Sequence, residues 1–98
     1  MTKLSLLDKN LIEKLFQMEG GYVLDFSNSR MGEFFQSELD INIYDKKYNY
    51  GSGSKANIIR GFINKEEETV VGKAIQKLIS YIETNIIIGK FEEEDFPQ

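Results

Sequence analysis

The sequence predicts a mainly α-helical fold, a compact bundle of about four short helices with room for one small two-stranded β element. Apolar residues recur at helical spacing in four stretches of the chain. Residues suited to a helix N-terminus, serine or glutamate, precede these stretches. Seven Phe and five Tyr in 98 residues supply enough apolar surface for one modest core, so we expect a single domain.

The first expected helix begins after Ser5, which stands at capping-box spacing from Asp8. We expect it to end at Gly20-Gly21, because glycine readily takes the left-handed conformation that terminates helices. Its predicted inward face consists of Leu11, Ile12, Leu15 and Phe16.

The second expected helix lies between two short β-prone segments, residues 22–26 and 41–43, which would form the small β element. Residues 27–29, Ser-Asn-Ser, offer several N-caps for this helix. Its predicted inward face consists of Met31, Phe34, Phe35 and Leu39.

A polar loop is expected over residues 45–53, and Ser52 or Ser54 then caps the third helix. The inward face of that helix consists of Ile58, Ile59, Phe62 and Ile63. Three glutamates, residues 66–68, favour the start of the fourth and longest helix, which Gly89 stops. Its inward face consists of Val71, Ile75, Leu78, Ile82 and Ile86.

These elements predict one helical interaction domain over residues 1–90, followed by a solvated acidic C-terminal tail over residues 91–98. Five aromatic residues are expected in the core: Tyr22, Phe26, Phe34, Phe35 and Phe62. The amphipathic stripes also allow a homodimer, because a sequence does not distinguish burial within a chain from burial between chains.

The residue types available for catalysis are few, because the chain contains neither histidine nor cysteine. This excludes imidazole acid–base catalysis, Ser-His and Cys-His nucleophiles, disulfides and thiolate metal sites. Paired carboxylates remain an alternative, but 16 acidic residues make chance pairs common. Asp40, Asn42 and Asp45 lack the glycine and terminal glutamate of a calcium loop. We therefore expect a protein that is not an enzyme and has no cofactor and no metal site.

The net charge of −4 argues against a general attraction to nucleic acid, so any such contact needs a local basic patch. One cluster offers this patch, and we take it as the candidate binding site for an anion, a nucleic acid or a protein partner. It consists of Lys46, Lys47, Tyr48, Tyr50, Ser52, Ser54, Lys55 and Arg60. The glycine- and serine-rich lead into the third helix suits either an anion-binding helix N-terminus or an ordinary serine cap.

Several segments of the chain together resemble a known bacterial module. They are residues 20–28, 33–35, 39–48, 53–56, 60–62 and 71–73. This order resembles the N-terminal module of AbiJ-type abortive-infection proteins, in which the module precedes a HEPN-like ribonuclease domain. The resemblance implies a sensing or adaptor role, with the chemistry in the following domain. Residues 56–60 carry one arginine where the family carries several basic residues, which argues against an inherited nucleic-acid role.

The first functional hypothesis is therefore a non-enzymatic protein-interaction or sensor module of a bacterial phage-defence system, with an effector or nuclease as its protein partner. A second is a stand-alone inhibitor encoded by a phage or mobile element, similar to an anti-CRISPR protein, that binds a host nuclease. A third is a nucleic-acid-binding module that uses the basic cluster. No signal peptide or membrane-length apolar run is apparent, so we expect a cytoplasmic protein that does not bind membranes.

Overall fold

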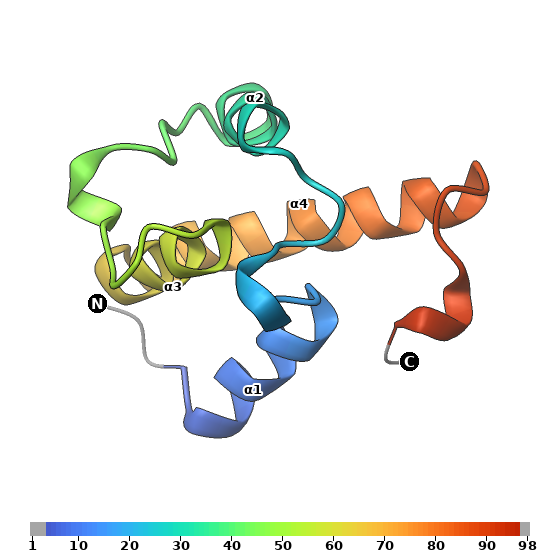
Figure 1. Ribbon diagram of the computed structural model, residues 1–98, viewed down its shortest axis with the longest axis horizontal. Helices are drawn as coiled ribbons and strands as arrows, with labels where there is room; N and C mark the ends of the chain where they lie inside the picture. The colour runs from blue at the N-terminus through green and yellow to red at the C-terminus, as the bar shows by residue number, and fades with distance from the viewer. Residues whose placement is uncertain (1–3, 97–98) are drawn as a thin grey trace.

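Four α-helices build the protein in its computed structural model, which describes residues 4–96. The helices are α1 (Leu6–Leu15), α2 (Asn28–Leu39), α3 (Lys55–Lys65) and α4 (Glu68–Ile87). Three 3₁₀ turns, η1 (Glu19–Gly21), η2 (Lys46–Tyr48) and η3 (Glu93–Asp95), lie between or after them. The mainly α prediction is confirmed. In the view of Figure 1, α4 runs along the long axis of the molecule, with α2 above it and α1 below it.

The helix starts follow from local capping. The Ser5 hydroxyl accepts a hydrogen bond from the Asp8 amide at 3.1 Å, and the Asp8 carboxylate accepts one from the Ser5 amide at 3.3 Å. At the start of α2 the Ser27 hydroxyl accepts from the Arg30 amide, and at the start of α3 the Ser54 hydroxyl accepts from the Asn57 amide. The start of α4 has no side-chain cap, but Glu68 places a carboxylate in its first turn. The three serines accept hydrogen bonds from backbone N–H groups that the helix itself leaves unpaired, and the Glu68 carboxylate lies at the end of α4 where such groups are concentrated.

The end of α1 differs from the prediction. The helix stops at Leu15, five residues before Gly20, because Gln17 adopts a positive φ of 53°. The Met18 amide then donates to the Glu13 carbonyl at 2.9 Å, which turns the chain back across the end of the helix. A non-glycine residue thus takes the left-handed position that the sequence assigned to the glycine pair.

The two β-prone segments form no strand among the described residues. Leu24 adopts a positive φ of 50°, and its amide donates to the Phe16 carbonyl at 2.8 Å. Asp40 is also left-handed, and residues 42–45 close a turn through a hydrogen bond from the Asp45 amide to the Asn42 carbonyl. Val23 and Ile43 are nevertheless fully buried, so these segments contribute to the core as irregular chain.

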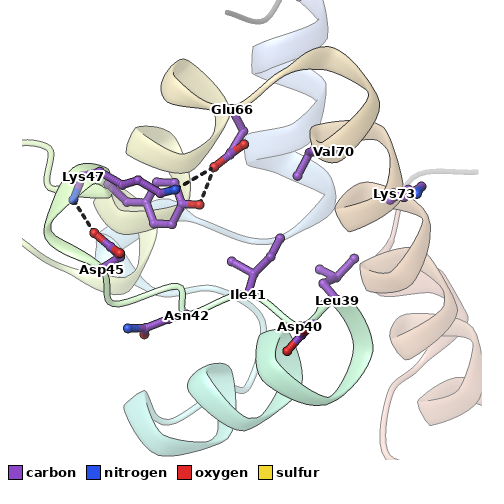
Figure 2. Close-up of a pocket in the computed structure, with 10 residues that line it drawn as sticks. Leu39, Asp40, Ile41, Asn42, Asp45, Lys47, Glu66, Val70 and Lys73 are labelled. Carbon is purple, nitrogen blue, oxygen red and sulfur yellow. Dashed lines mark hydrogen bonds and ion pairs between the residues drawn. The ribbon is translucent and has the colours of Figure 1, made fainter.

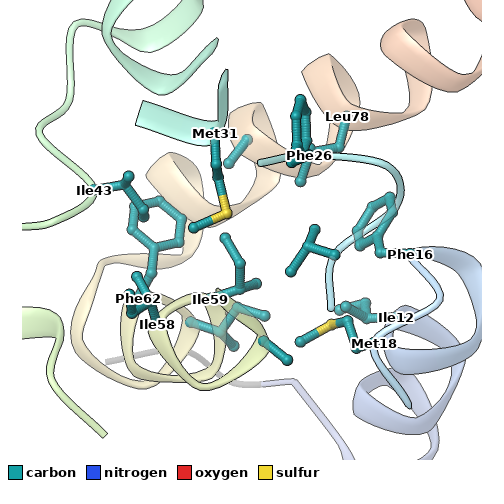
Figure 3. Close-up of a cluster of buried hydrophobic side chains, with 14 of the residues drawn as sticks. Ile12, Phe16, Met18, Phe26, Met31, Ile43, Ile58, Ile59, Phe62 and Leu78 are labelled. Atoms are coloured by element: carbon teal, nitrogen blue, oxygen red, sulfur yellow. The ribbon is translucent and has the colours of Figure 1, made fainter. Parts of the chain in front are cut away.

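The core gathers around α3, as Figure 3 shows. All four residues of its predicted inward face are buried. Tyr22 is the exception among the aromatic residues expected in the core, because 62% of it is exposed. Phe34 is partly buried, and its ring lies 5.6 Å from that of Tyr81, where α2 meets α4.

The segment predicted as a solvated tail is only solvated in part. Its acidic side chains are exposed, but Phe96 is buried and Phe91 packs against the core. The rings of these two residues lie 5.4 Å apart, and Gln17 donates a hydrogen bond to the Asp95 carbonyl. Aromatic burial thus holds residues 91–96 against the helices, while residues 97–98 lie outside the described part of the chain.

Over residues 4–96, no helix combines the length and the apolar character needed to cross a membrane.

Candidate functional site

The predicted basic cluster lies along η2 and the start of α3, and Gly61 brings these two elements together. A Cβ atom at residue 61 would lie 1.9 Å from the carbonyl oxygen of Tyr48, so only glycine lets the turn approach the helix this closely. The backbone of η2 therefore packs directly against α3, and the side chains of the cluster point in different directions from it.

Tyr48 is a core residue, which corrects its place in the predicted binding cluster. Only 2% of it is exposed, and its ring lies 5.3 Å from that of Phe62. Its hydroxyl donates to Glu66 Oε2 at 2.5 Å. Burial, and after it the Glu66 carboxylate, raises the pKa of Tyr48 well above its usual range. A ring that is enclosed in this way does not offer a face on which a nucleic-acid base can stack.

The lysines of the cluster differ in their surroundings. Lys46 is exposed on η2. Lys47 Nζ lies 3.6 Å from Glu66 Oε2 and 5.2 Å from the centre of the Tyr48 ring. Lys55 Nζ lies 5.3 Å from the centre of the Tyr22 ring. Lys47 and Lys55 thus each have a contact within the molecule, and for Lys47 it is a long ion pair.

Ser52 and Ser54 organise the start of α3. The Ser54 hydroxyl accepts from the Asn57 amide at 3.2 Å, and the Ser52 hydroxyl accepts from the Asn57 side-chain amide at 3.0 Å. Ser54 is therefore the N-cap of α3, and Ser52 accepts hydrogen bonds from the Asn57 side chain and the Ser54 amide beside it.

Arg60 joins α3 to α1. Its Nε and one terminal nitrogen donate to the two carboxylate oxygens of Glu13 at 2.8 and 2.6 Å, and its other terminal nitrogen donates to Asn57 at 2.7 Å. The hydrogen bond from Arg60 lowers the pKa of Glu13 below its ordinary 4.5, and the same contact raises the pKa of Arg60. This bidentate pair neutralises the arginine that the sequence offered for anion binding.

A small hollow of about 120 Å³ lies beside this ion pair, between α1 and α3. Tyr50, which is 48% exposed, forms part of its wall. The other lining residues are Lys9, Ile12, Glu13, Arg60, Ile63 and Asn64. Of the predicted cluster, the hollow brings together Tyr50 and Arg60 only.

An exposed apolar surface on α1 was not predicted. Leu6, Leu7 and Leu11 are 74%, 78% and 56% exposed, and we call them the leucine face. Leu11 was expected to point inward, but Ile12 and Phe16 take the buried positions. Leu7 and Leu11 stand four residues apart, so they project from the same side of the helix. That spacing places the two leucines on one side of the helix, but it does not indicate whether that side is buried.

A larger hollow, of about 370 Å³, lies between the end of α2, η2 and the start of α4. Figure 2 shows its mixed lining of aliphatic and charged side chains. Here Glu66 receives both the Tyr48 hydroxyl and the Lys47 ammonium. We call this hollow the Glu66 pocket.

The comparisons with known proteins found no matching family model, no matching curated protein and no matching solved structure.

Proposed function

We propose that this chain is a non-enzymatic protein-interaction module of a bacterial phage-defence system, and that the leucine face is the surface that meets its partner. The family resemblance supplies the defence context. The observation that carries the interaction role is the exposure of three leucines on one short helix. Exposed apolar side chains of this kind are unfavourable in water, and a protein partner that covers them removes that cost.

The attachment of α1 favours this role. The Glu13–Arg60 ion pair fixes one side of the helix to α3, and Ile12 and Phe16 anchor its inner face in the core. The leucine face is therefore presented on an ordered helix, which lowers the entropy cost of binding.

A protein partner is favoured over nucleic acid because of the charges around the basic cluster. Arg60 lies against the carboxylate of Glu13 in a short bidentate pair, so a phosphate would have to compete with a carboxylate that is already in place. The net charge of −4 opposes such a contact as well.

The test is capture of a partner by the tagged chain, with the double variant Leu7→Gln and Leu11→Gln compared with Ile87→Gln. Ile87 is 83% exposed at the far end of α4, so it controls for the loss of exposed apolar surface elsewhere. A captured protein is identified by mass spectrometry and its binding is repeated with purified components. We expect an effector or nuclease of a defence system, bound by the Ile87→Gln variant but not by the leucine-face variant.

Three results would contradict the proposal. Equal capture by the leucine-face variant would remove that surface from the interaction. A reconstituted partner with no role in phage defence would remove the defence context. Tight binding to duplex DNA, with a log–log salt slope of about −3 to −4 as for four phosphate contacts, would favour the nucleic-acid hypothesis instead.

A further inference from the structure

The Glu66 pocket combines apolar walls with a fixed carboxylate. Leu39 and Ile41 come from the end of α2 and the chain that follows it, and Val70 comes from the first turn of α4. Figure 2 shows these aliphatic side chains projecting toward the space below Glu66. A lining of this kind suits a ligand with a hydrocarbon stem and one charged end.

Glu66 is held in a defined orientation. It caps the C-terminus of α3, its amide donates to the Phe62 carbonyl, and its side chain is only 19% exposed. The Tyr48 hydroxyl and the Lys47 ammonium both contact Oε2. The contacts within the described chain therefore leave Oε1 for a further donor.

Lys47 indicates which charge the pocket attracts. Its ammonium is drawn to Glu66 across 3.6 Å, which is longer than a good N–H···O hydrogen bond. The lysine side chain is 59% exposed, and a long, solvated ion pair of this kind is weak. A cation that makes short hydrogen bonds to the same carboxylate can displace it.

The remaining charged groups around the pocket are Asp40, Asp45 and Lys73. Asp40 accepts a hydrogen bond from Gln36, and Asp45 accepts one from the Lys47 amide. Three carboxylates thus face two ammonium groups, and the balance favours a positively charged ligand.

We propose that the Glu66 pocket binds the guanidinium group of an arginine side chain on a protein partner. The arginine methylenes would lie along Leu39, Ile41 and Val70, and the planar guanidinium would replace Lys47 at the Glu66 carboxylate. Arginine fits better than lysine because its fork of donors reaches both carboxylate oxygens at once. This inference rests on the proposed function for the nature of the partner, but it concerns a surface separate from the leucine face.

The experiment is an NMR titration of the ¹⁵N-labelled chain at constant ionic strength with N-acetyl-arginine amide. The matched probes are N-acetyl-citrulline amide, which has nearly the same shape without the charge, and N-acetyl-lysine amide. We expect saturable shifts at the amides of Lys47, Glu66 and Val70 with the arginine probe, with a Kd in the millimolar range because a single side chain binds weakly. The lysine probe should bind several-fold more weakly, and the citrulline probe should not bind.

Two variants of the pocket have opposite expected effects. Glu66→Gln keeps an acceptor for the Tyr48 hydroxyl but removes the charge, and we expect binding about 10-fold weaker or more. Lys47→Gln removes the competing cation, and we expect binding about 2- to 5-fold tighter. Glu33→Gln makes the same charge change on α2 at a side chain that is 69% exposed and does not line the pocket, and it should leave binding unchanged.

The proposal is overturned if citrulline binds as well as arginine, if Lys47→Gln weakens binding, or if no saturable shift appears up to about 100 mM probe. If the arginine titration fails but the leucine-face variant still fails to capture the partner, the pocket proposal is wrong and the proposed function is unaffected. Conversely, arginine binding without any captured partner would support the pocket and count against the proposed function.

Discussion

The approach of η2 to α3 predicts opposite outcomes for the same substitution at two helical glycines. A Cβ atom at residue 61 would lie 1.9 Å from the Tyr48 carbonyl oxygen and 2.8 Å from its carbon. Both atoms belong to the backbone, so no side-chain rotation relieves the clash. At Gly72, in the first half of α4, an added Cβ meets nothing within 4 Å. We therefore expect Gly61→Ala to destabilise the fold and Gly72→Ala to stabilise it.

The magnitude follows from what η2 loses when it withdraws. To clear the new methyl group the turn has to move by about an ångström, which pulls the Tyr48 ring away from Phe62 and its hydroxyl away from Glu66. Losing the packing of a buried aromatic residue costs about 3–5 kcal/mol. Alanine returns about 1 kcal/mol through its higher helix propensity. We expect a net loss of about 2–4 kcal/mol for Gly61→Ala, against a gain of about 0.5–1 kcal/mol for Gly72→Ala.

The assay is equilibrium urea unfolding of the three proteins, followed by circular dichroism. For a domain of this size, thermal melting should show Gly72→Ala about 2–8 °C above the parent and Gly61→Ala well below it. The Gly72→Ala protein shows what the propensity term contributes alone. If the Gly61→Ala protein unfolds at the same urea concentration as the parent, or at a higher one, the backbone of η2 does not approach α3 as closely as described.

Three further predictions concern single side chains. Glu13→Gln should cost about 1 kcal/mol at pH 7, because the Arg60 pair is bidentate but Glu13 is 42% exposed. The pKa of Glu13 is lowered in the folded protein, so its carboxylate contributes stability above the unfolded pKa near 4.5, and this stability is lost as the pH falls. The free energies of unfolding of the parent and the variant should therefore converge at acid pH. Urea unfolding at several pH values measures this convergence. Burial, together with the hydrogen bond to Asp25, raises the pKa of Tyr81 to about 12, so the stability that this tyrosine contributes is complete below an unfolded pKa near 10 and is lost as the pH rises toward 12. Absorbance of the phenolate should show a step near pH 12 that Tyr81→Phe lacks; a step that persists in the variant assigns it to another residue. Ser54→Ala should lower the free energy of unfolding by about 1 kcal/mol through the lost cap of α3, and unchanged stability would show that this cap contributes nothing.

The helix starts could be predicted because their causes lie within a few residues. Ser5 and Asp8 are three residues apart, and the hydroxyl of Ser54 reaches only to the amide of Asn57. Such contacts form in almost any context that allows the helix, so composition and spacing suffice to find them. The buried face of α3 was predicted for a similar reason, since its apolar residues repeat with the helical period.

The irregular segments could not be predicted in this way. Leu24 takes a left-handed conformation while its amide pairs with the Phe16 carbonyl across the end of α1. β-propensity describes a side chain on a pleated surface and does not see this long-range pairing. The end of α1 was also not predicted. Gly20 and Gly21 can terminate a helix, but α1 has already ended because Gln17, which comes before them, adopts the left-handed conformation.

The candidate sites depended still more on contacts distant in the sequence. Arg60 was assigned to anion binding, but Glu13, which is 47 residues away, already holds it. Tyr48 was assigned to an exposed loop, but its side chain is buried. Because Gly61 has no side chain, η2 packs closely against α3 at this point. Residue types alone did not distinguish an exposed, unpaired cation or aromatic ring from one that is ion-paired or buried within the protein.

The sequence by itself determined the helical class, the capped starts of α1, α2 and α3, and the apolar face of α3, since each depends on residues within one or two turns of each other. Tertiary structure alone decided which charges were neutralised, which leucines stayed exposed and where a pocket formed around Glu66. The physical reason is that burial and ion pairing depend on which distant segments meet, and that outcome is set by the packing of the whole chain.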